Sequence, residues 1–128
     1  MTLPHVKRVS DSPAGEDGMR IPVDRLWPRG VAKDTARIDL WLKDLAPSHA
    51  LRKRFHGHPD AWNAFQTAYA AELAEPQAQA AVRTLDGHMR RGQVTLLYAA
   101  RDQERNNAVA LRAWLADTPG AAANRSAG

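Results

Sequence analysis

Residues 94–100, VTLLYAA, are the stretch that decides the fold of this 128-residue chain. The run is short, continuous and apolar, which is typical of a β-strand that is covered on both faces. The sequence RDQERNNAVALRAWLA (101–116) follows it, and there apolar residues recur at helical spacing behind Asp102, a residue type that caps helices. A buried strand that leads directly into a helix predicts an α/β protein.

Two further extended segments lie near the beginning of the chain. The sequence MRIPVDRL predicts a strand over Ile21–Leu26, and Val6–Val9 is a shorter candidate. Because proline donates no ladder hydrogen bond, Pro22 places the longer strand at an edge of the sheet or marks its beginning. We expect Ile21–Leu26 and Val94–Ala99 to be parallel neighbours joined by a right-handed helical crossover. The direction in which Val6–Val9 pairs is left open.

The segment between these strands is predicted to contain four helices. The first lies in KDTARIDLWLKDLAP (33–47), where apolar residues stand three, one and three apart. Ser48 can cap a second, short helix, while Pro59 begins the third and Pro76 the fourth. The third helix carries a stripe that we expect to be buried, formed by Trp62, Phe65, Tyr69 and Leu73.

The chain is therefore predicted to be a single α/β domain over residues 1–117, followed by a disordered tail at residues 118–128. Its sheet should be small and mainly parallel, with three or four strands and with helices packed on it. The oligomeric state is left open by the sequence.

Composition and charge exclude several classes of function. The net charge is +4, but basic and acidic residues are interleaved, and the one dense run is Arg52-Lys53-Arg54. Such a triplet is more typical of a solvated helix face than of a nucleic-acid-binding stripe. No apolar run is long enough to cross a membrane. Because the chain has no cysteine, it forms no disulfide, and the cytoplasm is the expected compartment.

No standard catalytic or cofactor motif is present. The chain has neither a phosphate-binding P-loop nor a serine nucleophile elbow, and it lacks the dinucleotide fingerprint. We expect no cofactor, and whether the protein is an enzyme is left open. His56 and His58 stand two apart at a helix break, whereas metal-binding pairs on helices stand three or four apart, so no metal site is expected. His58 is interpreted as a helix cap.

Four long phrases carry a family resemblance. They are EDGMRIPVDRLWPRG (16–30), WLKDLAPS (41–48), LRKRFHGHPDAWNAFQTAYAAEL (51–73) and GQVTLLYAARDQERNNAVAL (92–111). In this order they are similar to the YeaO-like family of bacterial proteins, domain of unknown function 488, over about residues 5–116. The family implies no established activity, substrate or cofactor.

Some members of that family carry a MarR-type regulator label, although nothing in this sequence has the pattern of a winged helix with a basic recognition helix. The chain departs from the family at two places. Pro22 stands where members usually have an aliphatic residue. The sequence RNNAV stands where many have HNHAV, so no role of those histidines passes to Arg105 and Asn107.

Two loops follow the predicted parallel strands, VDRLWPRG (23–30) and YAARDQERNN (98–107). Ligands of parallel sheets bind beyond the carboxyl ends of the strands, so these loops should meet at a crevice. The crevice favours an anion, because arginine forks suit phosphate or carboxylate and the last helix points its N-terminus there. An aromatic side chain of either loop offers a flat face to a ring. The predicted ligand-binding residues are Arg25, Trp27, Arg29, Tyr98, Arg101, Asp102, Asn106 and Asn107.

The same residues have a purely structural alternative. Arg25 can pair with Asp24, Asp39 or Asp102 and pin its loop to the helices, Trp27 can cover the core, and Asp102 can simply cap a helix. Two functions therefore stay open. The first is binding of, or action on, a phosphorylated or carboxylated small molecule or nucleotide. The second is a nucleic-acid-associated or regulatory module that uses the basic surface at residues 52–54.

Overall fold

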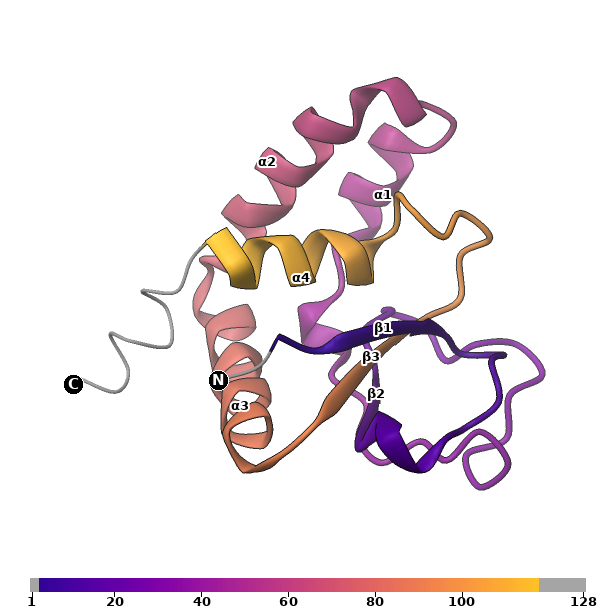
Figure 1. Cartoon of the computed structure of the whole chain (residues 1–128). Helices are drawn as coiled ribbons and strands as arrows, with labels where there is room; N and C mark the ends of the chain where they lie inside the picture. Colours follow the sequence, from indigo (N-terminus) through magenta and orange to yellow (C-terminus); the bar gives the residue numbers. More distant parts are fainter. Residues whose placement is uncertain (1–2, 118–128) are drawn as a thin grey trace.

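The computed structural model describes residues 3–117, which contain a three-stranded parallel sheet and four α-helices (Figure 1). The strands are β1 (His5–Arg8), β2 (Met19–Pro22) and β3 (Val94–Tyr98), and the helices are α1 (His49–Phe55), α2 (Trp62–Leu73), α3 (Pro76–Arg91) and α4 (Asn107–Asp117). The predicted α/β class is confirmed. The tail predicted at residues 118–128 lies outside the described residues. None of the helices within residues 3–117 has the length and apolar character needed to cross a membrane.

The last strand in the sequence is the central strand of the sheet, whose order is β1–β3–β2. Both neighbours run parallel to it, with Val6 and Ile21 standing opposite Leu96 on its two sides. The prediction that the segments around Ile21 and Leu96 are parallel neighbours is confirmed, although β2 spans Met19–Pro22 and not Ile21–Leu26. The direction of β1, which the sequence left open, is parallel as well.

Pro22 fits into β2 because its nitrogen faces away from the rest of the sheet. The N–H groups of Met19 and Val23 donate to the carbonyl groups of Gln93 and Leu97 at 2.9 and 3.1 Å. Hydrogen-bonding direction alternates along a strand, so the intervening Pro22 nitrogen points outward, where no ladder partner is needed. β2 is therefore the edge strand that the proline predicted.

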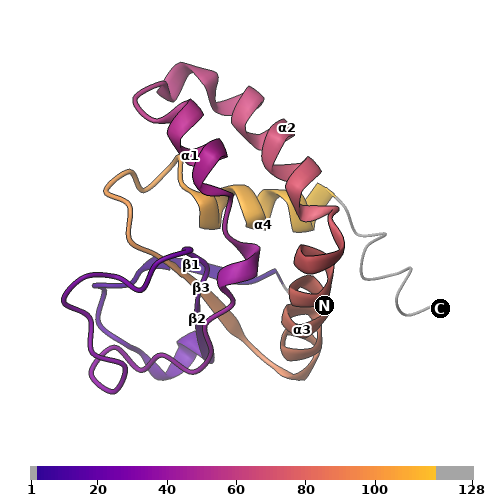
Figure 2. The same cartoon turned by 180° about the vertical axis from the view of Figure 1, so that it is seen from behind.

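The two faces of the sheet are covered by different kinds of structure (Figures 1 and 2). One face, which we call the helix face, carries Ile21 and Leu96 and packs against the helices in the main hydrophobic core. The other, the loop face, carries Leu97, which forms a small second core with Val9 and Ile38 beneath the connecting loops. All of β3 is buried, as its continuous apolar run predicted.

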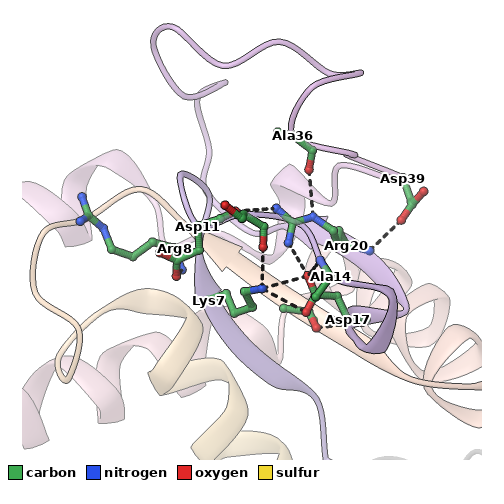
Figure 3. A network of polar contacts seen from close by, with 10 residues as sticks. Lys7, Arg8, Asp11, Ala14, Asp17, Arg20, Ala36 and Asp39 are labelled. Atoms are coloured by element: carbon green, nitrogen blue, oxygen red, sulfur yellow. Dashed lines mark hydrogen bonds and ion pairs between the residues drawn. The ribbon is translucent and has the colours of Figure 1, made fainter.

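A buried ion pair lies on the loop face (Figure 3). Arg20 has no exposed surface; its Nη1 lies 2.6 Å from Oδ2 of Asp17, and its Nε donates to the Ala36 carbonyl at 2.9 Å. Lys7 Nζ lies 3.1 Å from the same carboxylate oxygen. Because a buried charge is costly unless it is paired and hydrogen-bonded, this network holds the connecting loops against the sheet.

The helix predicted at the start of the crossover is wrong. Residues 31–42 form turns and irregular loop, and only Lys43–Leu45 make a single 3₁₀ turn. Ile38 is buried in the small core of the loop face, whereas Leu45 belongs to the main core. Ile38 and Leu45 therefore belong to two separate cores and do not form one helical stripe. Within the described residues, three α-helices, and not four, connect β2 to β3.

The other predicted helix boundaries are largely confirmed. The Ser48 hydroxyl accepts from the N–H of Leu51 at 3.0 Å and caps α1. α3 begins at Pro76 and ends at Arg91, directly before Gly92. His58 occupies the predicted N-cap position, but the turn that begins at Pro59 is a 3₁₀ turn before α2, and the His58 side chain makes no capping hydrogen bond.

The aromatic stripe of α2 is buried at only one end. Tyr69 and Leu73 lie in the main core, and the Tyr69 hydroxyl donates to the Leu45 carbonyl. Trp62 and Phe65, at the beginning of the helix, pack against that core but remain half-buried. The expectation of one fully buried face is therefore wrong for these two rings. Their exposed surface takes part in the cleft described next.

Candidate anion-binding cleft

A cleft of about 550 Å³ opens where β2 and β3 end. Its walls come from the segment that leaves β3, the beginning of α4, the end of α1 and the beginning of α2. In Figure 1 the orange segment after β3 rises toward the end of α1, which brings these parts of the chain together. The cleft thus lies where ligands bind in parallel sheets, beyond the carboxyl ends of the strands.

Four of the eight predicted ligand-binding residues line this cleft, namely Arg101, Asp102, Asn106 and Asn107. The other four, Arg25, Trp27, Arg29 and Tyr98, are not among its lining residues. The loop after β3 therefore faces α1 and α2 as well as Asp24 and Leu26, which follow β2, but the arginines that we expected from residues 25–30 do not line the cleft.

Arg25 points back into the body of the protein. Its Nε and Nη2 donate to the carbonyl groups of Pro47 and Ala46, each at 3.4 Å. This contact pins the loop after β2, as the structural alternative expected, with backbone carbonyls in the place of an aspartate. Arg29 is exposed on the same loop, outside the cleft lining.

Trp27 and Tyr98 have packing contacts. The Trp27 ring is half-buried against the small second core, lies edge-on to Trp41 with 5.4 Å between ring centroids, and donates from Nε1 to the Val31 carbonyl at 2.7 Å. Tyr98 is buried in the main core, and this burial raises the pKa of its hydroxyl. The ring surface of the cleft therefore comes from other residues.

The loop after β3 is shaped by two side-chain caps. Asp102 Oδ1 accepts from the N–H groups of Glu104 and Arg105, each at 2.9 Å, and these bonds lower the pKa of Asp102. The cap of α4 is Asn106, whose Oδ1 accepts from the N–H of Val109 at 2.9 Å. The prediction that Asp102 caps the last helix is wrong, because it stabilises the turn that leads to that helix.

Three arginines give the cleft its positive charge. Arg52 comes from α1, and Arg101 and Arg105 come from the loop after β3; all three are exposed. None of them forms an ion pair with another residue in the described part of the chain. Two carboxylates, Asp24 and Asp102, also line the cleft, so its net charge is positive.

One wall of the cleft is aromatic. The rings of Trp62 and Phe65 are stacked, with 5.5 Å between centroids and 17° between planes, and Phe55 stands edge-on to Phe65 at 5.9 Å. Leu26, with 72% of its surface exposed, adds an apolar group to the lining. Sequence analysis assigned the α2 rings to the core, because helical spacing alone does not tell which end of a stripe reaches the surface.

Asp24 joins the two strand ends beside the cleft. Its Oδ2 accepts from the N–H of Ala99 at 2.8 Å. Burial raises the pKa of Asp24, against the lowering effect of hydrogen bonds from the Ala99 N–H and the Asn107 side chain and of the Arg52 charge. From the sequence, Asp24 was expected only as a possible partner of Arg25. The predicted strand Ile21–Leu26 placed Asp24 inside the sheet, whereas β2 ends at Pro22 and leaves Asp24 just beyond the carboxyl end of the strand, where ligands of parallel sheets bind.

His56 and His58 line the cleft at the turn between α1 and α2, and both are exposed. Within residues 3–117, no group of three or more histidine, aspartate or glutamate side chains is arranged to hold a metal ion. The chemical character of the cleft comes from its arginines, its aromatic wall and its carboxylates.

Residues 4–127 match a family model described as the inactive DUF488-N3 subclade. The chain belongs to this family. It is 41% identical to uncharacterized protein YeaO of Escherichia coli K12 over 109 residues, which are 85% of this chain and 93% of YeaO. It is 39% identical to uncharacterized proteins Rv3073c of Mycobacterium tuberculosis H37Rv and Mb3100c of Mycobacterium bovis over 110 residues, 86% of this chain and 91% of each. No solved structure matches it.

Proposed function

We propose that this protein binds a small molecule that carries both an anionic group and a planar ring, in the cleft at the carboxyl ends of β2 and β3. The observation that carries the proposal is the convergence of Arg52, Arg101 and Arg105 on a cleft with an aromatic wall. Phosphorylated or carboxylated compounds, nucleotides included, have this chemistry.

The arginines supply the anion-binding groups. A guanidinium presents a planar fork of donors that matches phosphate and carboxylate oxygens. Arg52, Arg101 and Arg105 are exposed and form no ion pair with a residue in the range 3–117, so an incoming anion breaks no ion pair of these side chains. The first turn of α4 lines the same cleft and adds the partial positive charge of a helix N-terminus.

The aromatic wall supplies a surface for the ring. Trp62 and Phe65 are half-buried, so each has surface left for a ligand. A volume of about 550 Å³ lies within the usual range of small-molecule sites, which combine apolar walls with a few polar anchors. The combination favours an organic anion over free phosphate or sulfate.

We take the function to be binding and not catalysis. The family model that matches this chain describes an inactive subclade, and that description supports a protein that recognises a ligand without transforming it. We also assign the protein to the cytoplasm, a proposal that is supported by the absence of cysteine.

The test uses phenyl phosphate as the simplest probe with a ring and a phosphate, and inorganic phosphate for comparison. Trp62 lines the cleft, so its fluorescence reports binding, and calorimetry gives the affinity. We expect phenyl phosphate to bind more tightly than inorganic phosphate. Arg101→Ala and Arg105→Ala should each weaken it by about 1.5–3 kcal/mol, which is the usual contribution of a charge-assisted hydrogen bond.

Arg83→Ala is the matched control, because Arg83 is an exposed arginine on α3 outside the cleft. Its affinity for phenyl phosphate should equal that of the wild type. Arg29→Ala tests whether the anion binds at the loop after β2 or in the cleft. If only this variant loses affinity for phenyl phosphate, the anion binds at the loop after β2, as the sequence predicted. Absence of any phenyl phosphate binding would contradict the proposal.

A second candidate function is suggested by the basic triplet on α1. Arg52, Lys53 and Arg54 are all exposed, and Arg52 also lines the cleft, so a single-stranded nucleic acid could follow this surface. Binding of a labelled oligonucleotide should then fall steeply with salt and be lost in a Lys53→Ala, Arg54→Ala double variant. Our first proposal expects that double variant to bind phenyl phosphate normally.

A further inference from the structure

We propose that the ligand of the cleft is a mononucleotide whose base presents an amino group to the carboxylate of Asp24. This inference rests on the proposed function and adds the class of ligand. It starts from a feature that anion binding alone leaves unexplained: a half-buried carboxylate inside a cleft whose net charge is positive.

Asp24 lies deeper in the cleft than the arginines, although the charge of Arg52 still acts on its carboxylate. Asp24 is half-buried between the ends of β2 and β3, where the Ala99 N–H holds its Oδ2 at 2.8 Å. Arg52, Arg101 and Arg105 are exposed. A phosphate is repelled by the carboxylate and attracted by the arginines, so the anionic end of a ligand belongs with the arginines. The end beside Asp24 must be a hydrogen-bond donor, because an ionised carboxylate only accepts.

The aromatic wall completes the match to a nucleotide. Trp62 and Phe65 lie stacked in one wall of the cleft and line it together with Asp24. Stacking on aromatic side chains is how proteins commonly hold a nucleobase. A phosphosugar has no ring plane for this wall, and an aromatic acid has no donor edge for the carboxylate. A nucleotide has a phosphate, a flat ring and a donor edge in one molecule.

The carboxylate also selects among the bases. Guanine, cytosine and adenine each carry an exocyclic amino group, whereas uracil offers only oxygens and one ring N–H on that edge. Guanine presents its amino group next to a ring N–H, so the two can donate to one carboxylate together. We therefore expect GMP to bind more tightly than IMP, whose purine ring lacks only this amino group, with ribose 5-phosphate weakest because it lacks the stacking group.

The experiment measures the affinities of GMP, IMP and ribose 5-phosphate for wild type, Asp24→Asn and Asp102→Asn. The wild type should prefer GMP over IMP by roughly tenfold, the usual discrimination by a good base-edge contact. Asp24→Asn should abolish that preference and leave ribose 5-phosphate binding intact. Asp102→Asn is the matched control, because it neutralises another carboxylate of the cleft and should keep the preference.

The outcomes separate the two proposals. Ribose 5-phosphate binding that depends on Arg101, with no preference among bases, would overturn this inference and leave the proposed function standing. Failure of every phosphate compound to bind would overturn both. A GMP preference that survives in Asp24→Asn would also overturn the role of Asp24. The asparagine keeps an oxygen for the Ala99 N–H, and the wild-type ranking of GMP over IMP tests the inference even if that variant does not fold.

Discussion

The helix face and the loop face of the sheet are formed by alternate residues of the same strands, yet they are stabilised in different ways. On the helix face, Ile21 and Leu96 are completely buried among apolar side chains. Their neighbours on the loop face, Arg20 and Thr95, are just as buried but polar; Thr95 donates its hydroxyl hydrogen to the Asp17 carbonyl at 2.8 Å. One face is held by apolar contact area, and the other by a much smaller apolar core together with the pairing of a few buried charges.

The difference teaches that burial in a strand does not by itself indicate which interaction stabilises it. When a buried side chain on an apolar face is shortened, the free energy of unfolding falls roughly in proportion to the number of atoms removed. A buried ion pair behaves differently, because the loss of one partner leaves the other charge buried and unpaired. The loop face should therefore be more sensitive to a single substitution than its small area suggests.

The largest effect should come from Arg20→Ala. This change removes the 2.6 Å partner of Asp17, which keeps only Lys7 as an ion-pair partner within residues 3–117, and it frees the Ala36 carbonyl and empties a fully buried site, so we expect a loss of about 3 kcal/mol or more in the free energy of unfolding, measured with urea. The control replaces both charges, Asp17→Leu with Arg20→Met, and should cost clearly less. A loss below about 1 kcal/mol in Arg20→Ala would show that the pair behaves like an exposed ion pair.

On the helix face, Leu96→Ala should destabilise the protein by about 2–4 kcal/mol through lost contacts and a residual cavity. Leu96→Met keeps most of the volume and should cost less than about 1.5 kcal/mol. Both values come from the same urea experiment. Equal losses for Ala and Met would mean that packing volume is not what stabilises this face.

The two faces should also respond differently to acid. Burial acts to raise the pKa of Asp17, but hydrogen bonds from the Ala14 N–H, Lys7 and Arg20 outweigh it, and the pKa is lowered. Because the pKa of Asp17 is lower in the folded protein than in the unfolded chain, its ionised carboxylate stabilises the fold at any pH above the ordinary aspartate pKa of about 4. This contribution is lost as the pH falls through the lowered pKa of the folded state. The melting temperature of the wild type should therefore drop at acidic pH. In Asp17→Asn this drop should be shallower, and an unchanged slope would rule out Asp17 as its source.

The smallest effect should come from Trp27→Phe. The change removes the hydrogen bond from Nε1 to the Val31 carbonyl and keeps a ring on the small second core, so we expect a loss of about 0.5–1.5 kcal/mol. Phenyl phosphate binding should be unchanged, because Trp27 does not line the cleft. Weaker phenyl phosphate binding with unchanged stability would indicate that Trp27 contacts the ligand.

The sequence predicted the helix face better than the loop face. Strand β3, its parallel pairing with β2 and the edge position of Pro22 follow from local patterns that a fold must satisfy. The loop around Ile38 was mistaken for a helix because its apolar residues happen to have helical spacing while they enter two cores. The buried pairing of Asp17 with Arg20 depends on how loops fold onto the sheet, and no periodicity reports that.

The candidate site was half predictable for a similar reason. Parallel topology alone placed Arg101 and the beginning of α4 at the carboxyl end of β3. It could not tell that Arg25 turns back to the Ala46 and Pro47 carbonyls, nor that α1 and α2 supply the opposite wall. Those contacts depend on how the helices pack, which a single sequence does not specify.

The central place of β3 has a consequence for how the protein is made. His5 stands opposite Thr95, and β2 also pairs only with β3, so no strand has its partner until residues 94–98 have left the ribosome. Pairings so distant in sequence fold slowly. During synthesis, β1 and β2 stay unpaired until β3 has been made, and unpaired strand edges are templates for aggregation. A nascent chain stalled before residue 94 should therefore depend on chaperones, whereas the completed chain contains β3 and can form the whole sheet.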